Sequence, residues 1–311
     1  MILFAQSPTS AFHLHTVRID RIDDLSPSFR RFTLTGDRLD SFADNGFDQR
    51  IKLILPLEEH GLSTMPMTDD WYALWRELPD QHRNPIRTYT VRDVRAELRE
   101  IDVDVVVHPV DGPASIWAET AAIGDELIVL GPNALHEGVH GGVDFLPPPH
   151  AERILLAGDE TALPAIASIL ERLPATASGH AIVEVPHADD AVCVPSHPGF
   201  TVEVLARHGL PQGELLVPSV QAAAPGLLRS GRAGSTGQTE LGDVDVDVDM
   251  LWEVPSDDHG GPAQQAAPLY AWLAGEAGVI KTLRRHLVSE LGIDRKSVAF
   301  MGYWRLGRAE G

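Results

Sequence analysis

The chain has 311 residues, and its 25 basic and 45 acidic side chains give a formal net charge of −20. Such a charge repels phosphate backbones and anionic membrane surfaces, which argues against a nucleic-acid partner. The single cysteine, Cys193, excludes a disulfide framework and a thiolate cluster for iron–sulfur or structural zinc.

The hydrophobic content of 43 % is enough for the cores of two ordinary domains. The first residues lack the basic and apolar regions of a signal peptide, and no later apolar run approaches the roughly 20 residues that span a bilayer. We therefore expect a cytoplasmic protein without membrane insertion.

The first part of the chain, residues 12–132, consists of short runs in which apolar and polar residues alternate. The runs are "FHLHTVRI", "RRFTLTG", "RIKLILP", "RTYTVRDV", "EIDVDVVVHPV" and "DELIVLGP". Because Pro, Gly and Asp separate these period-two runs, they predict an antiparallel β-barrel or sandwich.

A Gly- and Pro-rich passage follows at 133–152 and is interpreted as a linker. It contains H-E-x-x-H, formed by His136, Glu137 and His140, a pattern that binds zinc when both histidines lie on one helix face. Gly138 between them and the glycines and prolines around them disfavour such a helix, so the sequence favours a polar linker over a zinc site.

From 153 to 311, uninterrupted apolar strands alternate with amphipathic helical segments, which predicts a mostly parallel α/β sheet. A stretch rich in Gly, Ser, Asp and Gln, at about 218–268, is interpreted as a flexible insertion. Its alternating aspartates at 243–249 lack the Gly turn and the terminal Glu of a calcium loop, and are better explained as a solvated acidic segment. A cleft between the two domains is the expected place for ligands.

Two segments of the first domain suggest a site for a phosphorylated cofactor. "RTYTVR" at 87–92 combines a cation, an aromatic ring and hydroxyls on one strand, although a mixed polar surface strand is the simpler alternative. "HPVDGPASIWA" at 108–118 places small residues at a turn into a short helix, where backbone N–H groups favour a pyrophosphate.

Together these segments resemble the ferredoxin-reductase-like flavoproteins, which carry R-x-Y-[ST] on a barrel strand. "GDETALPA", "WLAGE" and "GYWRLGR" in the second domain narrow the resemblance to the siderophore-interacting proteins, over nearly the whole chain. The resemblance implies an N-terminal antiparallel FAD-binding β-barrel and a Rossmann-like α/β NAD(P)-binding domain, with FAD as cofactor and NADPH or NADH as donor. A small redox protein is an alternative electron donor.

The resemblance also assigns residues. In the barrel it implies that Arg87 pairs with the FAD pyrophosphate, Tyr89 stacks on the isoalloxazine and Thr90 reaches flavin N5. The remaining residues expected at the cofactors are Thr88, His108, Gly112, Ala114, Ser115, Trp117, Gly158, Asp159, Glu160, Thr161, Gly275, Glu276 and Trp304. Among these, Trp304 is expected to shield the flavin, and Trp272, beside Gly275 and Glu276, could lie at the nicotinamide; core packing is the alternative for both tryptophans. For His108 the alternative is a hydrogen-bonded histidine at a strand end, and for Asp159 and Thr161 it is helix capping.

An anionic ferric chelate needs local positive charge on so acidic a protein. We expect the substrate-binding cations to be Lys52, Lys281, Arg284 and Arg285, with an exposed helix face as the alternative for the last three. Glu184, at the end of a predicted strand, suggests a free ribose and hence NADH, but the resemblance leaves NADPH open.

These features predict an oxidoreductase of iron acquisition, a flavoprotein in which hydride passes to flavin N5 and single electrons then reduce chelated Fe(III) to release Fe(II). No protein residue is needed as acid or base, and no resident metal is expected. The alternatives are a general NAD(P)H flavin oxidoreductase with another acceptor and a siderophore-binding flavoprotein without turnover. Open nicotinamide access and a basic chelate site distinguish them.

Overall fold

The computed structural model describes residues 9–107, 112–149, 151–230, 251–257, 261–263 and 267–307. By its internal contacts the chain divides into two units. The chain passes from the first unit to the second between Gly142 and Val143, inside the segment interpreted as a linker. Of the residues predicted at the cofactors, His108 lies outside these ranges.

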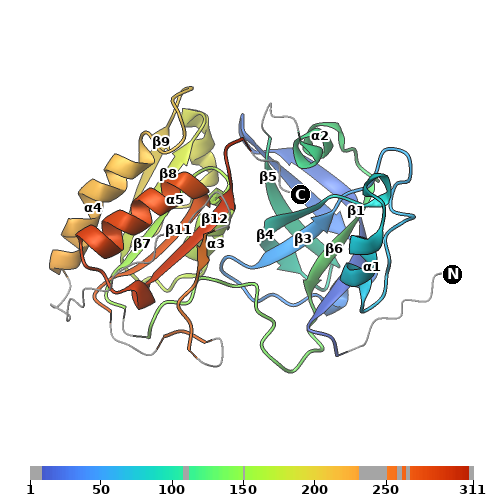
Figure 1. The fold of residues 1–311 in the computed structure, drawn as a ribbon, viewed down its shortest axis with the longest axis horizontal. Helices are drawn as coiled ribbons and strands as arrows, with labels where there is room; N and C mark the ends of the chain where they lie inside the picture. The colour runs from blue at the N-terminus through green and yellow to red at the C-terminus, as the bar shows by residue number, and fades with distance from the viewer. Residues whose placement is uncertain are drawn as a thin grey trace. The chain divides into compact units, whose positions relative to one another are not determined.

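Six strands of the first unit close into an antiparallel barrel (Figure 1). They are β1 (Phe12–Asp24), β2 (Phe29–Thr35), β3 (Arg50–Ile54), β4 (Ile86–Arg95), β5 (Glu100–Val106) and β6 (Glu126–Pro132). Their order around the barrel is β1-β2-β5-β4-β3-β6, with β6 returning to pair with β1. All six predicted runs form strands, and the predicted antiparallel barrel is confirmed.

The alternation that predicts these strands also fills the barrel. In β5, Ile101 and Val103 are fully buried in the hydrophobic core, whereas the intervening Asp102 is bonded to Arg95 with both oxygens, at 2.7 and 2.8 Å. Apolar residues therefore pack on one face of the strand and paired charges cover the other.

Two helices accompany the barrel: α1 (Trp71–Glu77) between β3 and β4, and α2 (Pro113–Thr120) between β5 and β6. α2 is the short helix expected after the Gly-containing turn. α1 was not predicted, because seven residues are too few for its apolar spacing to stand out, although Trp71 and Trp75, one turn apart, pack against a small buried cluster beside the barrel.

The second unit is an α/β sheet with strand order β10-β12-β11-β7-β8-β9. The strands are β7 (Ile154–Gly158), β8 (Gly179–Val185), β9 (Phe200–Ala206), β10 (Trp252–Glu253), β11 (Tyr270–Glu276) and β12 (Val298–Trp304). The helices are α3 (Leu163–Arg172), α4 (Leu216–Ser230) and α5 (Ala277–Arg284), which a π-helical turn continues over Arg285–Glu290.

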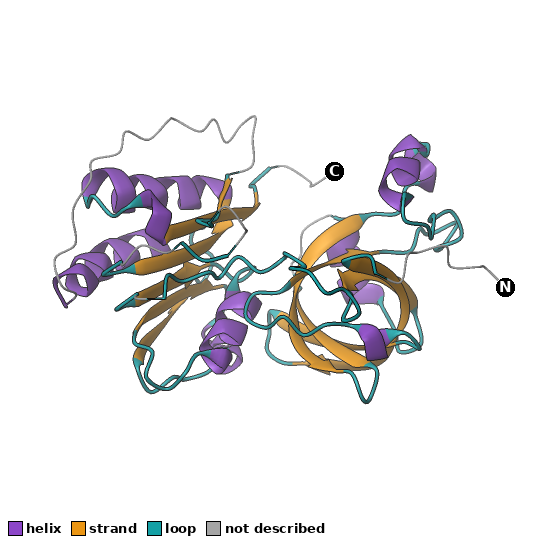
Figure 2. Cartoon of the chain, turned by 90° about the horizontal axis from the view of Figure 1, so that it is seen from below, coloured by secondary structure: helices purple, strands orange, loops and turns teal. Residues whose placement is uncertain are grey.

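Neighbouring strands of this sheet run parallel except at β10, which pairs antiparallel with β12. Helices cover both of its faces (Figure 2). Crossovers between parallel strands are right-handed, so the direction of each step along the sheet decides which face its helix covers. The step from β7 to β8 places α3 on one face. The steps from β9 to β11 and from β11 to β12 run in the opposite direction and place α4 and α5 on the other face. The carboxyl ends of β7, β8, β9, β11 and β12 therefore share one edge, where open α/β sheets bind ligands.

The structure corrects the start of the insertion expected at about 218–268. Leu216–Ser230 form helix α4, in which Leu216, Val220 and Ala224 are buried at a spacing of four residues. Pro218 and Pro225 in the same stretch favoured a loop, but the apolar helical face prevails over them. Residues 231–250, with the alternating aspartates, lie outside the described part of the chain.

No helix among the described residues is long and apolar enough to cross a bilayer.

Residues 46–48 belong by their contacts to the second unit, although the barrel surrounds them in sequence. The Asp48 carboxylate accepts the N–H groups of Asp144 and Phe145 and, at 2.9 Å, the indole N–H of Trp272. Complete burial, and next the charge of Asp144, raise the pKa of Asp48 to about 6. The sequence gives no sign of this contact, since its partners lie about 100 and 220 residues further along.

Candidate cofactor and electron-donor sites

The segment "RTYT" lies in β4 with the expected alternation. Tyr89 is paired across the strands with Ile51 and Arg87 with Leu53, and both partners belong to the barrel core. Tyr89 is half-buried and packs against that core. Its ring is therefore fixed by packing. Arg87 is half-buried, and its Nη1 donates to the carbonyl oxygen of Ile86 at 2.9 Å.

Thr88, on the opposite face of β4, lies beside Lys52 of β3. Both side chains are exposed, and Lys52 Nζ donates to Thr88 Oγ1 at 2.6 Å. The alternation of β3 explains why a lysine stands between isoleucine and leucine: it sends Lys52 outward. The outer face of the barrel thus carries a cation and a hydroxyl in direct contact.

The turn into α2 leaves room for a ligand. Among the described residues, which leave out 108–111, a Cβ atom at Gly112 would meet nothing within 4 Å and no side chain caps the start of α2. Ala114 and Ser115, in the first turn, are half-buried. Uncapped N–H groups beside open space suit the phosphate group expected there.

Trp117, predicted at the cofactor, packs into the barrel core, and its buried indole N–H has no hydrogen-bond partner among the described residues, so the cofactor contact stays a prediction. Its ring is 7 % exposed and lies 4.7 Å from the ring of Phe32, centroid to centroid. Helical spacing from Pro113 turns this position towards the barrel. His108, expected at the flavin, lies outside the described residues.

In the second unit, Asp159 joins three strand ends that the sequence separates widely. Its carboxylate accepts the backbone N–H of Thr161, the backbone N–H of Glu276 at 2.8 Å and the indole N–H of Trp304 at 2.8 Å. Burial, and next the charge of Glu160, raise the pKa of Asp159 to about 6. Residues expected at the two cofactors, on β7, β11 and β12, are thereby brought together.

Glycines make this junction possible. Gly275 has φ +145°, and a Cβ there would lie 2.6 Å from an Asp159 carboxylate oxygen. A Cβ at Gly158 would lie 2.5 Å from the carbonyl oxygen of Ala274. Both positions therefore require glycine for the close approach of β7 and β11.

Glu160 is a positioning residue rather than an open ligand. Its side chain is fully buried, and its carboxylate is held by both terminal nitrogens of Arg207, at 2.7 and 2.8 Å, and by Gln212 at 2.9 Å. The expected cofactor contact of Glu160 is corrected on this ground, since its oxygens already bind protein donors.

Glu184, considered from the sequence as a ribose ligand, is bound by donors of the protein itself. It is fully buried, and its carboxylate accepts the N–H groups of Gly213, Leu215 and Leu216, at 2.8 to 3.1 Å. These are the donors that precede and open α4, so Glu184 caps that helix. The placement of Glu184 therefore gives no support to the NADH preference that was suggested from its position in the sequence.

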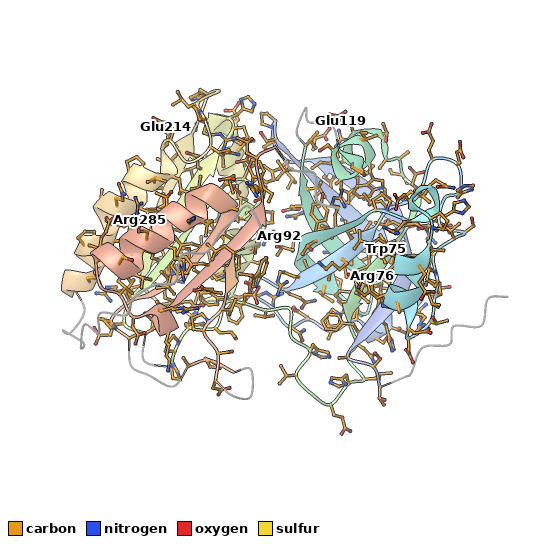
Figure 3. All side chains as sticks on the ribbon, viewed as in Figure 1. Trp75, Arg76, Arg92, Glu119, Glu214 and Arg285 are labelled. Carbon is orange, nitrogen blue, oxygen red and sulfur yellow. The ribbon has the colours of Figure 1, made fainter. Side chains whose placement is uncertain are left out.

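A pocket of about 500 Å³ opens at the same edge of the sheet, between the beginnings of α4 and α5. Its described lining consists of Gln212, Gly213, Glu214, Val217, Pro218, Glu276, Gly278, Val279 and Thr282. Figure 3 labels Glu214 close to the start of α4. Of these residues the sequence identified only Glu276; Gln212 and Glu214 follow a predicted strand, which was the available signal.

The second unit also shows how Trp272 and Arg284 are placed. Trp272 is fully buried, in agreement with the core alternative. Arg284 is 5 % exposed and donates to Glu253 at 2.8 Å, so it is corrected from a substrate-binding cation to a buried ion pair. Its position on the inner side of α5 explains the error.

The other predicted cations of this region are more accessible. Arg285 has a side chain that is 72 % exposed and lies 3.7 Å from a carboxylate oxygen of Glu290. Lys281 is half-buried in the middle of α5. These two remain candidates for contact with an anion.

The H-E-x-x-H segment has no helix within the described stretch 133–142. The rings of His136 and His140 instead donate to the carbonyl oxygens of Thr9 and Asn133, at 2.8 and 2.7 Å. The one-face helical arrangement that a zinc site of this pattern requires is absent there.

Comparison with known proteins adds the family. Residues 18–136 match the siderophore-interacting FAD-binding domain, and residues 151–307 match the siderophore-interacting protein domain. The chain belongs to the siderophore-interacting protein family.

Relatives of known name cover nearly the whole chain. The ferric vibriobactin reductase ViuB of Vibrio cholerae is 30 % identical over 92 % of this chain and 87 % of its own. The NADPH-dependent ferric-chelate reductase of Escherichia coli is 27 % identical over 91 % of this chain and 90 % of its own. A siderophore utilization protein from T. fusca, of solved structure, is 28 % identical with a TM-score of 0.70, over 97 % and 96 % of the two chains.

These matches confirm the predicted family, the oxidoreductase class, and FAD with a nicotinamide nucleotide as the cofactors. The roles of individual residues remain predictions, supported by the placements described above.

Proposed function

We propose that this siderophore-interacting protein is an FAD-dependent NAD(P)H ferric-siderophore reductase. The observation that carries the proposal is the extent of the family match, which includes both the barrel and the α/β sheet. An enzyme that passes electrons from a nucleotide to a chelate needs a flavin-binding unit and a nucleotide-binding unit, and this chain has both folds.

The barrel fits FAD by its donors and by its open space. Arg87 offers a guanidinium for a phosphate, Thr88 offers an exposed hydroxyl, and the start of α2 beside Gly112, which no described side chain caps, offers N–H groups. Thr90, which is 5 % exposed, is the hydroxyl that we assign to flavin N5. When bound, FAD supplies the exchange between two-electron donors and one-electron acceptors. Tyr89, held by packing on the barrel core, orients the ring system.

Lys52 is the residue we assign to the anionic chelate. It is exposed on the outer face of the barrel and is already oriented by Thr88. Siderophores hold Fe(III) through hard anionic oxygens, and these bind Fe(II) far more weakly, so reduction releases the iron. The role of Lys52 is to attract and position the chelate, with no proton transfer.

The edge formed by Asp159, Gly275 and Glu276, with its adjoining pocket, is where we place the nicotinamide nucleotide. The buried contacts of Asp159 hold three strand ends in one arrangement, which preorganises the nucleotide site.

One observation favours a second function, a general NAD(P)H flavin oxidoreductase with another acceptor, such as a small redox protein. Arg284 is buried against Glu253, so the cationic surface available to a chelate is smaller than the sequence suggested. A cytoplasmic location stays a prediction for either function.

The test is a steady-state assay of the FAD-loaded protein with NADH or NADPH, a ferric siderophore and a ferrous trap. We expect ferrous iron to form only when all components are present. Nucleotide oxidation with free flavin or a redox protein as acceptor, but none with ferric chelates, would favour the second function.

A further inference from the structure

The pocket between α4 and α5 is lined by hydrogen-bond acceptors. Glu214 and Glu276 bring carboxylates and Gln212 brings a carboxamide, whereas its described lining includes no lysine and no arginine. A phosphate dianion entering such a pocket is repelled by two like charges and finds no counter-charge.

The helix N-termini beside the pocket are already capped. Glu184 accepts the N–H groups of Leu215 and Leu216 at the start of α4, and Glu276 accepts the N–H of Val279 in the first turn of α5. Because carboxylates hold these donors, neither helix can offer them to a phosphate in the usual way.

The arginine nearest in sequence to Gln212, Arg207, is already bound to another side chain. Arg207 follows β9, five residues before Gln212, but its guanidinium is buried and bonded to both oxygens of Glu160. Turning it towards a phosphate would leave the fully buried Glu160 without its cation.

Gln212 provides a hydrogen-bond acceptor that suits a hydroxyl group. Its Nε2 donates to Glu160, which fixes the orientation of the amide, and its Oε1 is buried without a hydrogen-bond partner among the described residues. An acceptor in this state gains from a hydroxyl donor, which a ribose 2′-OH provides and a fully ionised 2′-phosphate does not.

We propose that this pocket receives the adenosine ribose of NADH through its free 2′-hydroxyl, and that Gln212 and Glu214 make the protein discriminate against NADPH. The inference rests on the proposed function, since it names the donor of that same reaction. It separates this chain from the Escherichia coli relative, whose name gives NADPH as the donor.

The donor preference is tested on the FAD-loaded protein by anaerobic flavin reduction, without any iron chelate. We expect kcat/KM for NADH to exceed that for NADPH by at least about tenfold, because like charges brought together in an interface are strongly unfavourable. Glu214→Arg supplies a cation for the phosphate, and should reduce this ratio by about tenfold or more.

Glu171→Gln is the matched control, because Glu171 is an exposed carboxylate of α3 outside the pocket lining. Together with Glu214→Gln it compares the same chemical change at two places, and only the pocket variant should alter the ratio. Equal use of the two donors by the wild type, or an unchanged ratio in Glu214→Arg, would overturn the inference.

Calorimetric binding of ADP-ribose and of 2′-phospho-ADP-ribose gives a second readout that needs no turnover. Tighter binding of ADP-ribose supports the inference, and equal or weaker binding contradicts it. If neither NADH nor NADPH reduces the flavin, the donor assignment of the proposed function fails, and the two binding constants still decide the preference of the pocket.

Discussion

At the scale of single residues, a position in the sequence and a position in space often lead to different roles. Lys52 and Arg284 were both expected to bind the chelate. The structure leaves Lys52 exposed beside Thr88 and buries Arg284 against Glu253. The difference follows from strand alternation in the first case and from the inner face of a helix in the second.

Arg87→Ala should lower FAD occupancy, because it removes the guanidinium assigned to the pyrophosphate. Loss of a charged hydrogen-bonding partner costs about 1.5–3 kcal/mol, or roughly 10- to 100-fold in affinity. The ratio of flavin to protein absorbance after purification and the Kd for added FAD measure this. Arg21→Ala removes a half-exposed arginine of β1 that bonds Asp23, and should leave both values unchanged; equal losses would contradict the assignment of Arg87.

Lys52→Ala should raise the KM for an anionic ferric chelate roughly 3- to 10-fold while flavin content stays constant, because an exposed charge contributes only modestly. The effect should shrink at high salt. Steady-state kinetics at two ionic strengths provide the measurement, with Lys296→Ala, at an exposed turn, as the control. A salt-independent change, or the same change in the control, would argue against a chelate contact.

At the scale of elements, the sequence predicts strands better than helices and sites. Every predicted strand is present, because alternating or continuous apolar runs directly reflect burial. α4 was missed because it contains two prolines, which are typical of loops. β10 was missed because its two residues are too few to show a periodic pattern. The carboxylates of Asp159, Glu160 and Glu184 were placed at the right edge of the sheet, but sequence alone cannot tell a buried acid that binds protein donors from one that binds a ligand.

Arg207→Ala should destabilise the second unit by about 3–5 kcal/mol, since it leaves the buried Glu160 and Glu184 without their shared cation. Urea unfolding followed by circular dichroism measures the change. Arg285→Ala, at a side chain that is 72 % exposed, should change stability by less than about 0.5 kcal/mol. A similar small effect from Arg207→Ala would mean that the ion pair is not needed for this edge of the sheet.

At the scale of the whole molecule, the division into two units was predictable and its details were not. The change from alternating to continuous apolar runs marks the division, and the chain passes between the units within the expected linker. The assignment of residues 46–48 to the second unit depends on the buried bonds of Asp48. Partners so distant in sequence leave no local pattern from which that contact can be predicted.

Asp48 should make stability depend on pH. Its folded-state pKa of about 6 exceeds the ordinary value of 3.8, so between these values the folded protein holds a proton that the unfolded chain releases. Its contribution therefore favours folding at low pH and is lost as pH rises through about 6. Relative to Asp48→Asn, the wild type should lose roughly 2–3 kcal/mol between pH 4 and pH 7.

Unfolding free energies of both proteins at pH 4 to 8 measure this difference. Using the difference cancels the contribution of Asp159, whose pKa is raised in the same way and is present in both proteins. Asp189→Asn, at an exposed position, should show a pH profile parallel to that of the wild type. A constant difference between wild type and Asp48→Asn would show that Asp48 does not titrate in this range.

The central claim, electron transfer from a nicotinamide nucleotide to a chelated ferric ion, is tested most directly by two anaerobic stopped-flow mixings. The FAD-loaded protein is first reduced with NADH, and a ferric siderophore and a ferrous trap are then added. We predict loss of the oxidised-flavin absorbance in the first step, and its return together with the ferrous signal in the second. A reduced flavin that no ferric chelate reoxidises, or a purified protein that binds no flavin, would contradict the account.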